Sequence, residues 1–254
     1  MIDLHCHYLP GIDDGAQTLE ESLDLARAAV AAGIRTAIMT PHVHAGRYEN
    51  NVTSIGKLCA AFQRVLEHKG IPLDIRAGGE VRISAEIMPM VEEGEIPFLG
   101  ELDGYRIMLL EFPHSHLILG ADKLINWLLA RRIRPLIAHP ERNKDVMKNV
   151  EKIEPFVKMG CLLQLTGASI LGHFGKPAQQ CAVKLIERQW ATVVATDAHN
   201  LEHRPPNLDL AYKALADMGG ELFARELTSE APGRLIARNP LLSKTVRVQA
   251  SEVS

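Results

Sequence analysis

The sequence of 254 residues lacks features that mark several classes of protein. Its four cysteines are scattered without a CxxC pair, so they predict reduced thiols rather than a disulfide framework. No apolar run approaches the roughly 20 residues that a membrane-spanning helix requires, and we expect no insertion into a membrane. The formal net charge of -3 argues against nucleic acid as the main partner, because phosphate-backbone binding usually needs a basic surface.

The residue pattern also predicts neither a secretory leader nor an internal linker. The chain opens on MIDLH, without the basic segment and apolar run of a secretory signal, and we expect a cytoplasmic protein. No internal segment rich in Ser, Gly or Pro separates two halves. The apolar content of 46% is enough for one well-buried core. We therefore expect a single domain over residues 1–244, followed by a polar tail over residues 245–254.

What the sequence does contain is an alternation of short apolar runs with amphipathic stretches of helical length. The runs predict strands at residues 1–7, 34–40, 73–83, 107–112, 134–138, 161–165 and 191–196. The amphipathic stretches predict helices at residues 19–33, 52–70, 117–132, 150–160 and 177–189, with further helices up to residue 239. Six or seven such repeats favour one parallel β/α barrel. A doubly wound sheet is the alternative that periodicity leaves open.

Nearly every predicted strand ends in a side chain that can bind a metal ion. In β/α barrels the chemistry lies at the C-terminal ends of the strands. The side chains at these ends are His5, His7, His42, Glu80, Glu111, His139, Asp197 and His199. The loop after the first strand adds the carboxylates of Asp13 and Asp14, which we expect to supply oxygen ligands.

The spacing of these residues has a physical reason. Residues i and i+2 of a strand point to the same face, so His5 and His7 could bind one ion together. Asp197 and His199 have the same spacing and could share that ion or hold an adjacent one. Imidazole combined with carboxylate is the ligand set of Zn, Mn or Fe rather than of Ca or Mg alone.

Each piece also has an ordinary interpretation. An HxH in a strand can be a packed pair, DDG is a turn and helix-start signal, and His139-Pro140 can simply end a strand. These explanations would all have to coincide at separate strand ends, so we favour a metal centre. Glu80 and Glu111 are suited to bridge cations. Cations held about 3.5–4 Å apart clamp the attacking and leaving oxygens of a displacement at phosphorus.

The order of these motifs resembles the polymerase and histidinol phosphatase (PHP) superfamily. The resemblance is closest to the bacterial protein-tyrosine phosphatases of capsule and exopolysaccharide operons, with HxH then DDG near the start and the later segments HPER and TDAHN. It covers about residues 1–240. It implies a PHP/TIM-like fold, a distorted (β/α)7-type parallel barrel with its metal site at the C-terminal ends of the strands.

The resemblance also implies a ligand set for two or three divalent ions, with Mn most expected and Fe, Zn, Co or Mg as alternatives. The ligands that it assigns are His5, His7, Glu80 and Asp197 for one ion, Glu80, Glu111 and His139 for a second, and Asp14, His42 and His199 for a third.

Two arginines follow from the same resemblance. Arg142 of HPER would bind phosphate, and Arg204, which follows the TDAHN segment, matches the second arginine of the family. The planar guanidinium is suited to bidentate phosphate binding. The sequence departs from the family at Pro205-Pro206, which could alter this loop. His44 is a candidate general acid, although a solvated loop histidine is the more ordinary interpretation.

These features predict a metal-dependent phosphomonoester hydrolase, in which a metal-held hydroxide attacks phosphorus. No cysteine is followed six residues later by an arginine, and the first strand offers only Asp3 toward a DxDx(T/V) motif. The resemblance implies phosphotyrosine in a protein as substrate, and we expect the tail of a tyrosine autokinase of polysaccharide export. The alternatives are a small-molecule phosphatase such as histidinol-phosphate phosphatase, a phosphodiesterase, or an inactive metal-stabilised binding module.

Overall fold

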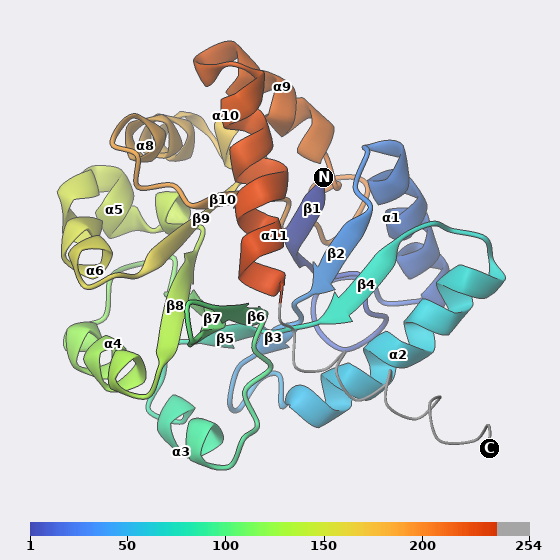
Figure 1. Ribbon diagram of the computed structural model, residues 1–254, viewed down its shortest axis with the longest axis horizontal. Coiled ribbons are helices and arrows are strands. Elements are labelled where there is room, and N and C mark those ends of the chain that lie inside the picture. Colours follow the sequence, from blue (N-terminus) through green and yellow to red (C-terminus); the bar gives the residue numbers. More distant parts are fainter. Residues whose placement is uncertain (238–254) are drawn as a thin grey trace.

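Parallel strands surround a common axis in the computed structural model, which describes residues 1–237 (Figure 1). The strands are β1 (Ile2–Cys6), β2 (Thr36–Met39), β3 (His42–Val43), β4 (Asp74–Ala77), β5 (Glu80–Arg82), β6 (Gly100–Leu102), β7 (Tyr105–Glu111), β8 (Ile133–Ala138), β9 (Leu162–Thr166) and β10 (Val193–Ala195). One sheet has the order β1-β2-β4 and the other the order β10-β9-β8-β7-β5-β3. The predicted domain boundary at residue 244 and the tail 245–254 lie outside the described residues.

The two sheets are parts of one barrel, because two strand positions are each broken in the middle. β2 and β3 are separated at Thr40-Pro41, and proline has no N–H for a strand ladder. β4 and β5 are separated at Gly78-Gly79. A Cβ on Gly78 would lie 2.7 Å from Cγ2 of Ile38, so the packing at this break admits only glycine. Counting each broken pair once and leaving out β6, which pairs antiparallel with β7 off the barrel path, gives seven strand positions, as the sequence predicts.

The barrel closes where β1 meets β10, without a regular ladder. The backbone N–H of His7 donates to the carbonyl of Ala198 (2.9 Å), and the N–H of Asp197 donates to the carbonyl of His5 (2.7 Å). Asp3 adds side-chain bonds, with Oδ1 accepting from the N–H of Thr196 at 2.9 Å. These contacts bring the HxH and DxH segments, which are far apart in the sequence, side by side.

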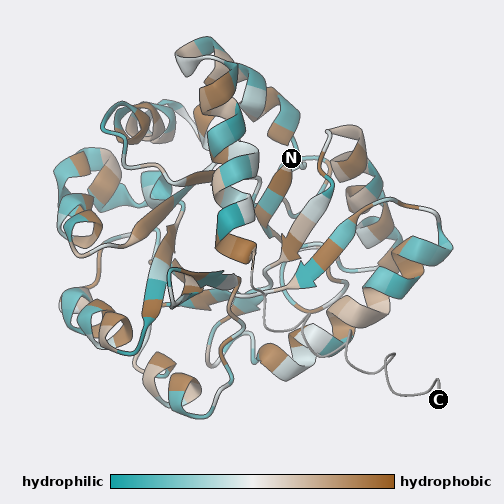
Figure 2. Cartoon of the chain, in the orientation of Figure 1, coloured by the Kyte–Doolittle hydropathy of each residue, from teal (hydrophilic) through white to brown (hydrophobic). Residues whose placement is uncertain are grey.

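Helices cover the outside of the barrel (Figure 1). The longer helices are α1 (Leu19–Ala31), α2 (Val52–His68), α4 (Ala121–Ala130), α8 (Lys176–Glu187) and α9 (Leu208–Gly219). The shorter ones are α3 (Ile87–Glu92), η1 (Pro140–Arg142), α5 (Lys144–Lys148), η2 (Val150–Ile153), α6 (Glu154–Lys158), α7 (Gly167–Ile170), α10 (Glu221–Arg225), η3 (Glu226–Glu230) and α11 (Ala231–Ile236). Their ribbons carry both apolar and polar residues, as surface helices do (Figure 2). Among residues 1–237, every helix is too short or too polar to cross a lipid bilayer.

Some predicted boundaries are wrong. The helix expected over residues 150–160 is present over 150–158, but it begins as the 3-10 helix η2 and continues without a gap as α6. The helix expected from residue 117 starts only at Ala121, because Gly120 before it has a left-handed backbone (φ +82°) that interrupts a helix. The short antiparallel strand β6 was not predicted, and neither were α3, η1, α5 and α7.

A second apolar core fills the barrel interior, apart from the larger one between strands and helices. We call it the inner core, and its buried members are Leu4, Ile38, Leu99, Ile107, Leu109, Leu136, Ala138, Val193, Ala195, Ala231, Leu235 and Ile236. The last three come from α11, which lies across the barrel (Figure 1). A Cβ on Gly233 would lie 3.5 Å from Cδ1 of Ile2 at the start of β1. α11 therefore closes the N-terminal end, and the C-terminal strand ends are left for the polar residues.

Candidate metal and phosphate site

All nine predicted metal ligands come together at the C-terminal strand ends. Each belongs to at least one group of three or four side chains whose ligand atoms lie within 4.8 Å of one another. The groups are His5, His7 and Glu80; His5, His139 and Asp197; His7, Asp14, His42 and His199; His42, Glu80 and Glu111; and Glu111, His114 and His139. The structure therefore collects every strand-end residue that the sequence singled out, and adds His114.

The innermost group is formed by the two histidines of β1 and its extension. Nε2 of His5 lies 3.2 Å from Nε2 of His7, 3.3 Å from Oε2 of Glu80 and 3.2 Å from Oδ1 of Asp197. These side chains are almost completely buried, yet Oε2 of Glu80 and Oδ1 of Asp197 accept no hydrogen bond. Buried carboxylate oxygens normally have a partner. Two imidazole nitrogens and two carboxylate oxygens that accept no hydrogen bond, aimed at one point, are the donor set that a divalent cation fits.

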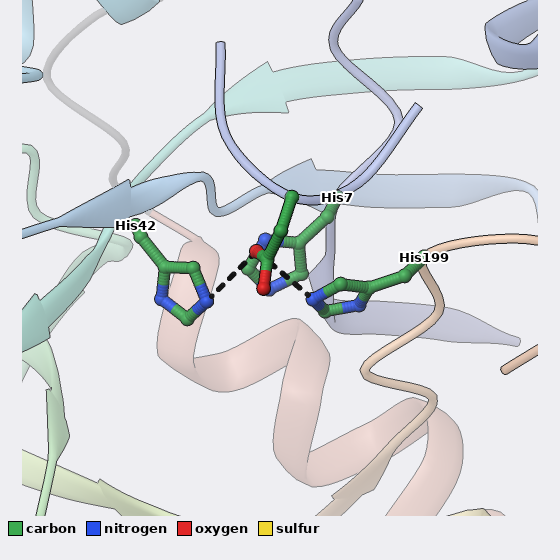
Figure 3. A group of neighbouring side chains, drawn as sticks. His7, His42 and His199 are labelled. Atoms are coloured by element: carbon green, nitrogen blue, oxygen red, sulfur yellow. Dashed lines mark ion pairs between the residues drawn. The ribbon is translucent and has the colours of Figure 1, made fainter. Parts of the chain in front are cut away.

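A second focus lies nearer the surface, around Asp14. Oδ1 of Asp14 is 3.2 Å from Nε2 of His42 and 3.6 Å from Nε2 of His199. Figure 3 shows the rings of His42 and His199 reaching toward one carboxylate, with His7 beside them. Nε2 of the buried His199 has no hydrogen-bond partner. This group also has the composition of a metal site, and it shares His7 with the innermost group.

Glu80 lies between the groups. Its Oε1 is 2.8 Å from Nε2 of His139, while its Oε2 is 2.9 Å from Nδ1 of His42. Oε1 of Glu111 on the adjacent β7 forms an ion pair with Nη1 of Arg82 at 2.9 Å. Because the two oxygens of Glu80 face different histidines, this carboxylate has the geometry of a bridging ligand.

Hydrogen bonds behind the rings set their orientation. Nδ1 of His5 lies 2.8 Å from Oε1 of Gln164, and Nδ1 of His7 lies 2.6 Å from Oδ2 of Asp13. Metal-binding histidines characteristically have such a partner on the second nitrogen, which leaves the first directed at the ion. The expectation that Asp13 supplies a ligand oxygen is therefore wrong, because it lies behind His7. Gln164 was missed, although a polar residue inside the apolar run 161–165 was a signal for it.

The loop of the DDG motif needs its glycine. A Cβ on Gly15 would lie 2.2 Å from the carbonyl oxygen of His7. The N–H of Gly15 donates to Oδ1 of Asp13 at 2.9 Å, and Oδ2 of Asp13 also accepts from the N–H of His42 at 3.0 Å. The motif thus packs the loop directly against the HxH segment.

Two left-handed residues shape the other side of the site. His139 has φ +32° and Asp197 has φ +53°, a conformation that non-glycine residues seldom adopt. His139 directly follows β8 and Asp197 stands two residues after β10, where the turn directs each side chain into the site. Such backbone strain is found where function fixes a side chain.

Both predicted arginines converge on Asp197. Nη1 of Arg142 and Nη2 of Arg204 contact its Oδ2, so Oδ1 is left toward the histidines. The guanidinium of Arg142 also lies over the ring of Phe174, 4.4 Å from its centroid. Arg204 reaches the site despite Pro205-Pro206.

A cleft of about 200 Å³ lies over these side chains. Its lining residues are Asp14, His42, His44, Arg47, Tyr48, Glu80, Arg82, Glu111, His114, His139, Arg142, Asp197 and Arg204. Arginine guanidinium groups and side chains able to bind a metal ion therefore line the same cleft. This arrangement suits the binding of a negatively charged phosphate group.

The electrostatics of the site favour bound positive charge. Burial alone would lower the pKa of His5, but the carboxylates of Glu80 and Asp197 outweigh it and raise that pKa to about 9. Burial opposes ionisation of Asp197 too, yet His5, Arg204 and Arg142 hold its pKa well below the usual range. The carboxylates are thus ionised and attract protons or cations, and a metal ion can replace the histidine protons.

The cysteines take no part in this site. All four are buried and free. Burial raises the pKa of Cys59, Cys161 and Cys181 to about 12 and that of Cys6 well above its ordinary value. Since the thiolate is the nucleophilic form, none of the four is prepared for attack on phosphorus.

Residues 1–237 match the protein family described as capsular polysaccharide synthesis, CpsB/CapC. The chain belongs to the CpsB/CapC family. It is 35% identical over 239 residues to the tyrosine-protein phosphatase YwqE of Bacillus subtilis (strain 168), covering 94% of this chain and 92% of YwqE. It is 29% identical to the tyrosine-protein phosphatase CpsB of Streptococcus pneumoniae, over 93% of this chain and 98% of CpsB.

Solved structures agree with this assignment to the CpsB/CapC family. A chain from the crystal structures of YwqE and CpsB, described as unique metal-dependent tyrosine phosphatases, superposes with a TM-score of 0.86 at 34% identity, covering 94% of this chain and 95% of that chain. The lactonase Lmo2620 of Listeria monocytogenes shares only the fold, with a TM-score of 0.57 at 14% identity over 92% of this chain and 94% of the lactonase. The resemblance and the barrel predicted from the motifs are both confirmed.

Proposed function

We propose that this chain removes phosphate from tyrosine side chains of proteins, with two or three divalent ions held by the nine strand-end ligands. The enzyme class is that of its family, a metal-dependent tyrosine-protein phosphatase. The observation that carries the proposal is the convergence of these ligands and two arginines on one cleft.

We divide the ligands among the ions as the resemblance to the family implies. His5, His7, Glu80 and Asp197, which lie close together, would hold one ion, and Glu80 would also reach the second. The ligands completing the other ions are Glu111 and His139 for the second, and Asp14, His42 and His199 for the third. When bound, the ions activate a water and offset the charge of the phosphate. We propose Mn as the main ion, with Fe, Zn, Co or Mg as alternatives.

The arginines bind the non-bridging phosphate oxygens. Arg142 is held in place by Asp197 and by the ring of Phe174, so little side-chain freedom is lost when phosphate arrives. Arg204 reaches Asp197 from the segment between β10 and α9. Together they offer several N–H donors to the phosphate group, which carries two negative charges when it is fully ionised.

The size of the cleft supports a protein substrate. Its volume of about 200 Å³ lies below the roughly 300–1,000 Å³ of typical small-molecule sites. It accommodates a phosphate and part of an aromatic ring, while the rest of the substrate stays outside. A phenolate leaving group has a pKa of about 10 and needs little help from an acid. His44, in the cleft wall, is the candidate if an acid is used.

The specific substrate that we propose is the phosphotyrosine tail of a tyrosine autokinase of polysaccharide export, in the cytoplasm. A flexible tail fits a small cleft because a single side chain can enter it alone. Membership of a capsular polysaccharide synthesis family supports this partner.

The test compares kcat/KM for a phosphotyrosine peptide, a phosphoserine peptide and histidinol phosphate under one metal condition. The phosphotyrosine peptide is expected to be the best substrate, because its leaving group is the least basic. A tenfold or greater preference for histidinol phosphate, about 1.4 kcal/mol of transition-state binding, would contradict the tyrosine assignment. The metal centre would survive that result.

A further inference from the structure

One histidine of the metal-competent groups in residues 1–237 has no role in the proposed ligand set. His114 lies beyond the end of β7, in the wall of the cleft. Its ligand nitrogen, a carboxylate oxygen of Glu111 and the ligand nitrogen of His139 lie within 4.8 Å of one another. Glu111 and His139 are two of the three ligands proposed for the second ion. The loop after β7 therefore brings one more imidazole to the second ion site, whose proposed ligands include a single histidine, His139.

The ring of His114 faces that site although the side chain is exposed. Its ring is stacked on that of His139, with centroids 5.5 Å apart and planes inclined by 20°. Stacking and coordination both require an imidazole near His139, but only coordination uses the ring nitrogen.

The loop that carries His114 is tied to the loop that carries His139. The N–H of Lys144 donates to the carbonyl of His114 at 2.8 Å, and Nδ2 of Asn143 donates to the carbonyl of Pro113 at 2.7 Å. Asn143 and Lys144 directly follow the HPER segment that begins at His139. The two imidazoles are therefore held at a fixed separation by the backbone, as ligands of one ion must be.

We infer that His114 is a further protein ligand of the second ion, together with Glu80, Glu111 and His139. This inference rests on the metal centre of the proposed function. A second imidazole changes a site with two carboxylates and one histidine into one with equal numbers of each. Imidazole suits Zn and Fe, whereas Mg prefers oxygen ligands, so His114 increases both retention of a Zn or Fe ion and discrimination against Mg.

Ion binding without substrate tests the inference directly. The protein is stripped of metal and then titrated with Zn²⁺ or Mg²⁺ in competition with a chromophoric chelator. His114→Phe keeps an aromatic ring for stacking on His139 but removes the nitrogen, and His114→Ala removes both. His116→Phe is the matched control, because His116 is an exposed neighbour whose ring contacts Ser115.

Both His114 variants are expected to weaken one Zn²⁺ site by about tenfold or more, since even indirect partners of metal ligands contribute about 10–100-fold in affinity. Mg²⁺ binding should change less, and His116→Phe should bind as the wild type does. With Co²⁺ as the ion, the visible absorption should differ between the wild type and His114→Phe.

The outcomes separate this inference from the proposed function. Wild-type Zn²⁺ binding by His114→Phe, or a loss with His114→Ala alone, would show a stacking contact and overturn the ligand role. No ion binding by the wild type would overturn the metal centre and this inference together. A protein that binds ions through His114 but does not hydrolyse phosphotyrosine would leave the inference standing and remove the proposed function.

Discussion

The two ends of the barrel interior have opposite chemistry although the same strands build both. On β7 the inward-facing series runs from Ile107 through Leu109 to Glu111, and along β10 and the two residues after it the series runs from Ala195 to Asp197. The first members pack in the inner core against α11, and the last members lie among the metal-competent groups. The change takes place within a single strand, over one or two inward-facing positions.

This contrast indicates that the apolar end of the barrel supplies the stability that allows the other end to hold buried charges. Glu111 is buried near Glu80, and burial together with that like charge raises its pKa. A set of buried carboxylates and histidines is costly to hold without a cation. The apolar end is closed by α11 and supplies hydrophobic stabilisation without contacting the cleft. Barrels of this type divide stability and chemistry in the same way.

Metal removal is the largest perturbation of the charged end. Exhaustive chelation is expected to abolish turnover, and Mn²⁺ or Co²⁺ should restore it, because the nine proposed ligands would hold the ions that activate water. The measurement is phosphotyrosine-peptide hydrolysis with metal analysis of the same samples. Ion binding should also raise the melting temperature, as any ligand of the native state does. Full turnover by a verified metal-free sample would refute the mechanism.

Leu235→Ala perturbs the other end. Leu235 on α11 is 2% exposed and packs in the inner core. Its truncation should lower the free energy of unfolding by about 2–5 kcal/mol, the usual cost of a large-to-small core change. The kcat/KM of the folded enzyme should stay within about twofold. Leu222→Ala is the control, because Leu222 is 84% exposed and should cost almost nothing. A strong kinetic defect in Leu235→Ala would mean that the two ends are coupled.

Arg142→Ala should weaken catalysis at the charged end of the barrel without releasing the ions. We expect the ions to stay bound while kcat/KM falls about ten- to a hundredfold, the worth of a charge-assisted hydrogen bond of about 1.5–3 kcal/mol. Arg131→Ala is the matched control, because this arginine also lies over an aromatic ring, that of Trp127 at 3.7 Å, but does not line the cleft. An unchanged kcat/KM in Arg142→Ala would show that phosphate binds elsewhere.

Phe174→Ala is the mildest of the changes. The ring contacts the guanidinium of Arg142 and not the proposed ions, so it is a positioning residue. A cation–π contact of about 0.5–1 kcal/mol predicts a loss of roughly two- to fivefold. The loss should be largest in KM, and Phe174→Tyr should restore it. Equal losses in Ala and Tyr variants would rule out the stacking role.

Much of the fold was readable because strand and helix periods are local properties. The broken strand at Gly78-Gly79 could be predicted, since glycine interrupts a run of β-formers. The change from 3-10 to α geometry within residues 150–158 could not, because both parts have the same apolar spacing as one α-helix. β6 was missed because its three residues form a strand only through pairing with β7.

By itself, the sequence determined which side chains stand at the strand ends, since HxH, HPER and DxH are carried by strands whose period is visible in the chain. Only the tertiary structure decided how each is used. Asp13 orients His7 instead of joining Asp14, and Gln164 meets His5 across 159 positions of sequence. His114 reaches its neighbours because two loops are tied together by backbone hydrogen bonds. Packing between distant segments of the chain brings such partners together. The spacing of residues along the sequence does not reveal which segments will pack against each other.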